Sequence, residues 1–181
     1  MATAIQAFVG SYDIDRTHST VQFAIRHLNV STFRASFGEV DGRLAVEEDS
    51  ILLEAQARVE SVSIVEPAFR DHVVRGMDFF GADAHPLATF RSTSVVLEDG
   101  GSAVVAGELT IRDVTHPVTA VGTYEAPTQD PFGVHRAGLE LRATIDRRDW
   151  AMDWQAPLPD GADALGWEVD ITAHLELTRQ L

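Results

Sequence analysis

The segment WEVDITAHLELT, residues 167–178, alternates apolar and polar side chains without a break. Its apolar positions are Trp167, Val169, Ile171, Ala173, Leu175 and Leu177. A period of two residues is that of a β-strand with one buried face. Because the strands of a parallel sheet are buried on both faces, a strand with one apolar and one charged face predicts an antiparallel sheet.

The same alternation recurs along most of the chain. It is clear over 20–27, 51–60, 103–112 and 138–146, and weaker over 34–46, 87–97 and 117–125. With the opening segment this makes eight predicted strands. Eight long antiparallel strands expose two edges unless the sheet closes, and closure removes both edges. We therefore predict an all-β protein built as one elongated, eight-stranded antiparallel barrel, with a β-sandwich as the alternative.

One helix is predicted between these strands, over residues 67–75. Pro67 suits the first helical position, and Gly76, with its freedom to take positive φ, suits the residue after the last turn. Phe69 and Val73 lie four residues apart and so share a face, which we expect to pack against the barrel end. The helix would then act as a lid, with Phe79 and Phe80 in the following segment anchoring its exit.

The sequence Arg70-Asp71-His72 lies on that helix and has the residue types of a catalytic cluster. Asp71 and Arg75 are also four residues apart, in the order that favours a helical ion pair. The structural interpretation, a charged face in contact with water, is favoured over the catalytic one.

Composition limits the classes of function. The chain has 181 residues, which suits a single domain over 1–181, and a formal net charge of -14. So acidic a protein should not bind nucleic acid or anionic membrane surfaces. There is no cysteine, which excludes disulfides and thiolate ligands. No apolar run is long enough to span a membrane, so stable membrane insertion is not expected, and no signal peptide is recognised at the N-terminus. A cytoplasmic location is the resulting expectation.

Five side chains stand out against the strand pattern. His27 and His135 continue the apolar parity of their strands, so both are candidates for a polar contact at a cavity mouth or, less favoured, for a metal pair, with a satisfied core or rim histidine as the alternative. Trp150, Trp154 and Trp167 would either line a cavity entrance or lie in the core. The sequence has no phosphate-binding glycine loop and no zinc or serine-hydrolase motif, so we predict no catalytic residue, no metal and no cofactor.

The sequence resembles the YceI-like polyisoprenoid-binding proteins over residues 12–178. Four blocks carry the resemblance. The first is Tyr12, Asp15, His18, Ser19, Phe23, His27 and Phe37-Gly38; the second is Arg70-Asp71-His72, Asp78-Phe79-Phe80, Pro86 and Phe90-Arg91-Ser92; the third is GELTIRDVTHPV, 107–118; the fourth is RRDWAMDW, 147–154. The sequence departs from the family pattern at Ala35, His85 and Asp113, none of which bears on a cavity.

The resemblance implies a lipocalin-like barrel that holds an isoprenoid lipid or quinone in its interior and carries out no chemistry. Family resemblance also favours a homodimer. An enzyme that acts on a lipid through His27 or His135, and a structural domain with a filled core, are the alternatives. The predicted ligand-binding residues are the inward positions of the strands and lid, namely Val21, Phe23, Ile25, His27, Leu53, Ala55, Phe69, Val73, Phe79, Phe90, Leu109, Ile111, His135, Leu139, Leu141, Trp150, Trp167 and Ile171.

Overall fold

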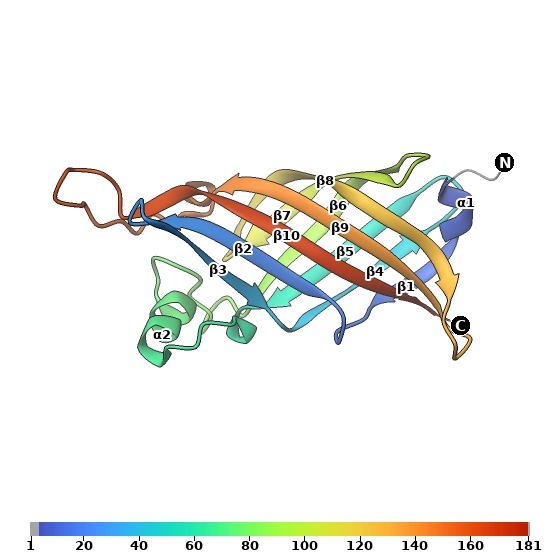
Figure 1. Ribbon diagram of the computed structural model, residues 1–181, viewed down its shortest axis with the longest axis horizontal. Helices are drawn as coiled ribbons and strands as arrows, with labels where there is room; N and C mark the ends of the chain where they lie inside the picture. The colour runs from blue at the N-terminus through green and yellow to red at the C-terminus, as the bar shows by residue number, and fades with distance from the viewer. Residues whose placement is uncertain (1–3, 181) are drawn as a thin grey trace.

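Antiparallel strands close into an elongated barrel in the computed structural model, which describes residues 4–180 (Figure 1). The elements are α1 (Ala4–Phe8), β1 (Gly10–Ile14), β2 (Thr20–His27), β3 (Ser31–Phe37), β4 (Val40–Val46), β5 (Ile51–Arg58), the 3-10 helix η1 (Val59–Ser61), α2 (Pro67–Arg75), β6 (Leu87–Leu97), β7 (Ser102–Ile111), β8 (Val114–Gln129), β9 (His135–Asp146), the 3-10 helix η2 (Arg147–Trp150) and β10 (Leu165–Arg179). The predicted all-β barrel with short helices is confirmed.

The barrel closes because β10, which lies between β9 and β2 in the sheet, also pairs with β1 at the edge of the sheet. It pairs with β9 along its length, with β2 over residues 165–174 and with β1 over residues 177–179. β1 also pairs with β4, and β2 with β3. β1 and β2 therefore occupy one place in the barrel in succession, as do β3 and β4, and the ten strands of residues 4–180 fill eight places.

The predicted strand over 34–46 is two strands, and the prediction was wrong on that point. Ala35 and Phe37 are buried at odd positions, whereas Val40, Leu44 and Val46 are buried at even ones. One residue is gained at Gly38–Glu39, and the strand kinks there. The segment that follows β5 also leaves the sheet near this kink. It forms η1, and a single β-bridge then joins Phe37 to Val62. The chain then departs from the wall toward α2.

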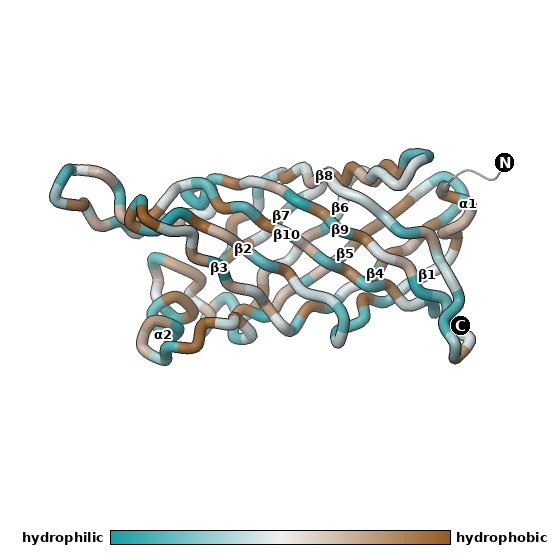
Figure 2. Tube along the Cα trace, viewed as in Figure 1, coloured by the Kyte–Doolittle hydropathy of each residue, from teal (hydrophilic) through white to brown (hydrophobic). Residues whose placement is uncertain are grey.

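The half of the barrel that holds the termini is filled with side chains. Phe8 of α1 lies against Tyr12 and Tyr124, with ring centroids 6.0 and 5.6 Å away. Tyr12 and Leu177 are fully buried there. Burial raises the pKa of Tyr12, partly offset by Arg179. These buried side chains make this half a packed plug that closes one end of the barrel. Figure 2 shows hydrophilic and hydrophobic residues alternating along the strands.

None of the helices within residues 4–180 has the length and apolar character that a membrane crossing requires. The prediction about a signal peptide rests partly on residues 1–3, which lie outside the described residues.

A polar cluster fixes the turn between β1 and β2 to the outside of β9 and β10. The Asp15 carboxylate accepts hydrogen bonds from Arg136 at 2.8 Å and from the main-chain N–H of Thr17 at 2.8 Å, and His18 Nδ1 lies 3.1 Å away. Burial alone would raise the pKa of Asp15, but these hydrogen bonds outweigh it and lower that pKa to about 2. Arg136 also pairs with Asp130 and Glu176.

We expect Asp15→Asn to destabilise the fold in a pH-dependent way. An unfolded aspartate has a pKa of about 3.9, so the native carboxylate contributes its full stabilisation above that pH and loses it as pH falls toward 2. After allowance for solvent screening, the variant should lose about 1–2 kcal/mol of unfolding free energy at pH 7. Urea unfolding at pH 7, 4 and 2 measures it. If the difference in unfolding free energy between the wild type and Asp15→Asn does not shrink as pH falls, the ionic explanation is contradicted.

Candidate ligand-binding site

The other half of the barrel is hollow. A cavity of about 430 Å³ runs from mid-barrel to the end beside α2, and its wall is almost entirely apolar. On β10 it extends from Leu175 past Val169, a stretch of roughly 20 Å at the rise of a strand. The alternation that the sequence shows is the cause, because every second side chain of each strand points inward.

Small side chains leave this space open. Ala55 and Ala57 on β5, Ala143 on β9 and Ala173 on β10 all line the cavity. The first two belong to one strand and the other two to neighbouring strands, since Ala143 pairs with Ile171 and Ala173 with Leu141. Larger inward side chains at these positions would fill the hollow, so the cavity depends on the small size of alanine at each of them.

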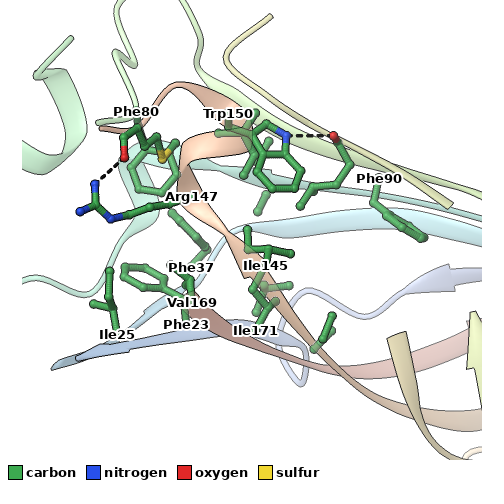
Figure 3. A pocket seen from close by; sticks show the side chains of 18 of the residues that line it. Phe23, Ile25, Phe37, Phe80, Phe90, Ile145, Arg147, Trp150, Val169 and Ile171 are labelled. Carbon is green, nitrogen blue, oxygen red and sulfur yellow. Dashed lines mark hydrogen bonds between the residues drawn. The ribbon is translucent and has the colours of Figure 1, made fainter. Parts of the chain in front are cut away.

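Most of the predicted ligand-binding residues line this cavity, although their contact with a ligand stays a prediction. They are Val21, Phe23, Ile25, His27, Leu53, Ala55, Phe69, Val73, Phe79, Phe90, Leu109, Ile111, Leu141, Trp150 and Ile171. Figure 3 shows several of them pointing toward one another from different strands.

Trp167 does not line the cavity. The pairing of β10 with β2 is irregular between Leu165 and Val169, where Leu165 opposes His27 and Val169 opposes Ile25. This β-bulge turns Trp167 out of the apolar series. Its ring stacks instead on the guanidinium groups of Arg147 and Arg148, 4.2 and 4.8 Å from the ring centroid.

His135 and Leu139 also lie outside the cavity. His135 is exposed at the first position of β9, where the strand begins beyond the filled half of the barrel. Leu139 points inward as predicted, but it is part of the packed core near the termini, 5% exposed. The alternation predicts which face a residue occupies; it does not predict how far along the barrel the hollow extends.

Several cavity residues were not predicted. Phe33 and Phe37 of β3 line it, as do Phe80 after α2 and Met152 after η2, while Trp154, which the sequence offered as a candidate for a cavity entrance, lines it as well. The two β3 residues follow the same odd parity as Ala35, so the pattern contained that signal. Met152 and Trp154 lie in an irregular segment, where sequence periodicity carries no information about direction.

Helix α2 lies at the open end of the barrel, below the loop that joins η2 to β10 (Figure 1). Pro67 takes the first turn, and the Glu66 side chain caps the helix by accepting from the main-chain N–H groups of Ala68 and Phe69. Val73 is buried, whereas Asp71 is exposed and pairs with Arg75 at 2.9 Å. Asp71 therefore lies on the solvated surface that the sequence indicated, whereas Arg70 is half-buried in a pair with Glu60 and His72 lines the cavity.

One detail of the predicted helix is wrong. Gly76 has a φ of -57°, so a positive φ is not what requires glycine there. A Cβ at Gly76 would come within 2.3 Å of the carbonyl oxygen of His72, and this close approach is the actual constraint. Phe69 is 40% exposed, so it covers the mouth rather than filling the core.

Aromatic contacts join α2 and the segment after it to the barrel wall and to the η2–β10 loop at the mouth. Phe69 of α2 meets Phe33 of β3 edge-on, 5.4 Å between centroids. Phe79 lies 5.0 Å from His72 and 5.7 Å from Trp154 of the η2–β10 loop.

We expect Phe69→Ala to speed ligand release with a small loss of stability. The ring is half exposed, so its truncation removes a contact across the mouth rather than a buried core group. Asp71→Ala, on the exposed face of the same helix, is the matched control and should cost only about 0.3–0.5 kcal/mol. Stopped-flow transfer of a fluorescent prenyl lipid to vesicles measures the off-rate. Equal off-rates for both variants would exclude α2 as a lid.

Few polar side chains face the cavity. His27, Gln56, His72 and Arg147 line it among the apolar residues. Arg147 is 3% exposed, and burial lowers its pKa despite three nearby aspartates. His27 makes no side-chain hydrogen bond or ion pair within residues 4–180. The arrangement therefore offers a long apolar surface with one buried cation near its mouth.

Comparisons with known proteins agree with this geometry. A model of the YceI-like domain matches residues 12–177. A UPF0312 protein of Pseudomonas aeruginosa is 34% identical over 154 residues, which cover 83% of this chain and 80% of that protein.

Two solved structures share the fold. BcnA of Burkholderia cenocepacia has a TM-score of 0.71 at 22% identity, covering 90% of this chain and 98% of that one. A polyisoprenoid-binding domain from Saccharophagus degradans, described as implicated in plant cell wall breakdown, has a TM-score of 0.72 at 12% identity, covering 93% and 98%. The match of the family model to nearly the whole barrel, hollow half included, means that this chain belongs to the YceI-like family.

Proposed function

We propose that this protein, as one domain over residues 1–181, binds and carries an isoprenoid lipid or a prenylated quinone in the hollow half of its barrel and performs no chemistry on it. The observation that carries the proposal is the cavity itself: an apolar slot about 20 Å long, closed by a packed plug at one end and flanked by aromatic side chains at the mouth. A slender apolar chain with a head group at one end fits that shape.

The energetics favour such a ligand. Each carbon of a chain that leaves water for an apolar wall contributes about 0.8 kcal/mol, so a five-carbon prenyl unit contributes up to about 4 kcal/mol before the entropy cost of binding. A few units suffice for tight binding. The Saccharophagus degradans domain is described as polyisoprenoid-binding, which supports the same class of ligand here.

Catalysis is the weaker alternative. His27 lines the cavity, but it lacks a partner within residues 4–180 that would orient its ring, and His135 lies outside the cavity. A general acid or base works best when a second group fixes its direction. A chemically altered lipid after incubation with the protein, lost in His27→Ala, would favour the enzyme.

The direct test is mass spectrometry of lipids extracted from purified protein, compared with those from a variant whose cavity is blocked. A prenyl lipid found at near-stoichiometric amounts in the wild type and absent from the variant supports the proposal. No lipid in the wild type, together with no uptake of added prenyl lipid, would refute it. Homodimerisation and a cytoplasmic location stay predictions, to be tested by sedimentation of the full chain and by cell fractionation.

A further inference from the structure

Arg147 is an unusual component of an apolar cavity wall. It is the one arginine that lines the cavity within residues 4–180, and it is 97% buried, as its 3% exposure gives. Buried cations normally pair with a carboxylate, because an uncompensated charge in an apolar interior is costly. No carboxylate of residues 4–180 lies within ion-pair distance of Arg147.

Its described hydrogen bonds go to main-chain carbonyls instead. Nε donates to Gly166 at 2.8 Å, Nη1 donates to Met152, and Nη2 donates to Leu165 over a long 3.4 Å. The ring of Trp167 covers one face of the guanidinium. A guanidinium has five N–H groups, so two have no acceptor among residues 4–180.

We propose that the remaining N–H groups of Arg147 bind the carbonyl oxygen of a ligand head group, which makes Arg147 the residue that selects prenyl lipids ending in a ketone or quinone. This inference rests on the proposed function. Figure 3 shows the Arg147 side chain among the apolar groups of the cavity, with Phe80 and Ile25 labelled beside it. A prenyl tail would occupy the slot toward Leu175, and its oxygen-bearing end would lie at Arg147.

The surroundings favour a neutral carbonyl over a diphosphate. Asp146, Asp153 and Asp163 all place negative charge around Arg147. Diphosphates are usually held by several cations or a metal ion, whereas Arg147 would be alone in that role within residues 4–180. A diphosphate bound at Arg147 would be repelled by the negative charge of these three aspartates. A carbonyl oxygen accepts a charge-assisted hydrogen bond and adds no net charge.

The competing explanation is that Arg147 only holds together the two ends of the η2–β10 loop, through the carbonyls of Met152 and Leu165. Two probes with the same tail separate the explanations: geranylgeranylacetone, which ends in a ketone, and the corresponding tetraprenyl hydrocarbon. Because Trp150 and Trp154 line the cavity, quenching of tryptophan fluorescence reports binding of either probe.

We expect the wild type to bind the ketone about 10- to 100-fold more tightly than the hydrocarbon, as befits a hydrogen bond to a charged group. Arg147→Met should abolish that preference and leave hydrocarbon binding within a few fold. Arg148→Met is the matched control, since Arg148 is adjacent, exposed and outside the cavity, and it should keep the preference.

Three results would overturn the proposal: an unchanged preference in Arg147→Met, an equal loss for both probes, or tighter binding of geranylgeranyl diphosphate than of the ketone. If Arg147→Met does not fold, infrared spectroscopy of the ketone bound to the wild type decides. A carbonyl band at lower wavenumber than in alkane solvent supports the proposal, and an unshifted band overturns it. Failure of the proposed function is distinct, because the hydrocarbon would then not bind the wild type either.

Discussion

Ala173→Trp should abolish binding of a long prenyl chain while the protein stays folded. Ala173 lies on β10 between Val21 of β2 and Leu141 of β9, and all three line the hollow. An indole at this point would stand across the slot and exclude the tail from the part of the cavity that reaches Leu175. Each five-carbon unit that no longer enters forfeits up to about 4 kcal/mol, which is about a thousandfold in Kd.

The cost in stability should be modest because the new ring enters empty space rather than a packed core. Overpacking a filled interior costs about 1–3 kcal/mol, and we expect Ala173→Trp to fall at or below the lower end. Thr172→Trp, one residue earlier on β10 and outside the cavity, is the control and should bind as the wild type does. Titration with a fluorescent prenyl lipid gives the Kd, and urea unfolding gives the free energy of unfolding.

Undiminished binding by Ala173→Trp would mean that the tail does not reach mid-barrel. If Ala173→Trp loses binding because it is unfolded, the loss does not show that the slot is blocked. The unfolding measurement is therefore part of the test. Ala143→Trp provides a second blocking variant. Ala143 lies on the neighbouring strand β9, where it pairs with Ile171 of β10.

The barrel was predictable because periodicity records burial directly. One apolar and one charged face per strand excludes a parallel sheet, and the lengths of the strands leave closure as the means of removing the edges. β1 escaped prediction because Gly10–Ile14 is too short to establish a period. The kink at Gly38–Glu39 escaped too, although the shift of apolar positions from odd to even in that segment records it.

The site was predictable only in part, for two physical reasons. Alternation gives the inward face but not the depth of the hollow, so Leu139 was placed in the cavity although it belongs to the plug. The pairing of β10 with β2 is irregular between Leu165 and Val169, which both line the cavity, and Trp167 between them is outside the cavity for that reason. The buried arginine gave no signal, because Arg147 belongs to a charged turn whose direction depends on tertiary contacts.

The largest loss of stability is expected from Trp150→Ala. Trp150 is 1% exposed, packs with Ile111 and Met152, and lies 5.3 Å from the ring of His116. Its Nε1 donates to the carbonyl oxygen of Leu109 at 3.1 Å, which ties η2 to β7 (Figure 3). Removal of a buried indole typically costs about 3–5 kcal/mol, and the Leu109 carbonyl would lose this donor as well.

Trp150→Phe separates the ring from its N–H group. It keeps most of the apolar volume and loses the hydrogen bond, so we expect a smaller cost of about 1–2 kcal/mol. Urea unfolding at pH 7 measures both variants, and a cost below about 1 kcal/mol for Trp150→Ala would mean that η2 is not held by this residue.

Ligand should partly rescue Trp150→Ala, because a molecule that binds only the folded state stabilises it by mass action. At a free concentration 100 times the Kd, that contribution is about 2.7 kcal/mol. Ala173→Trp should show no such rescue, since its slot is blocked while its fold is sound. The two variants therefore separate the roles of the wall: Trp150 holds the open end of the barrel in shape, and Ala173 keeps its interior empty. Rescue of both variants by the same prenyl lipid would place the lipid somewhere other than the slot.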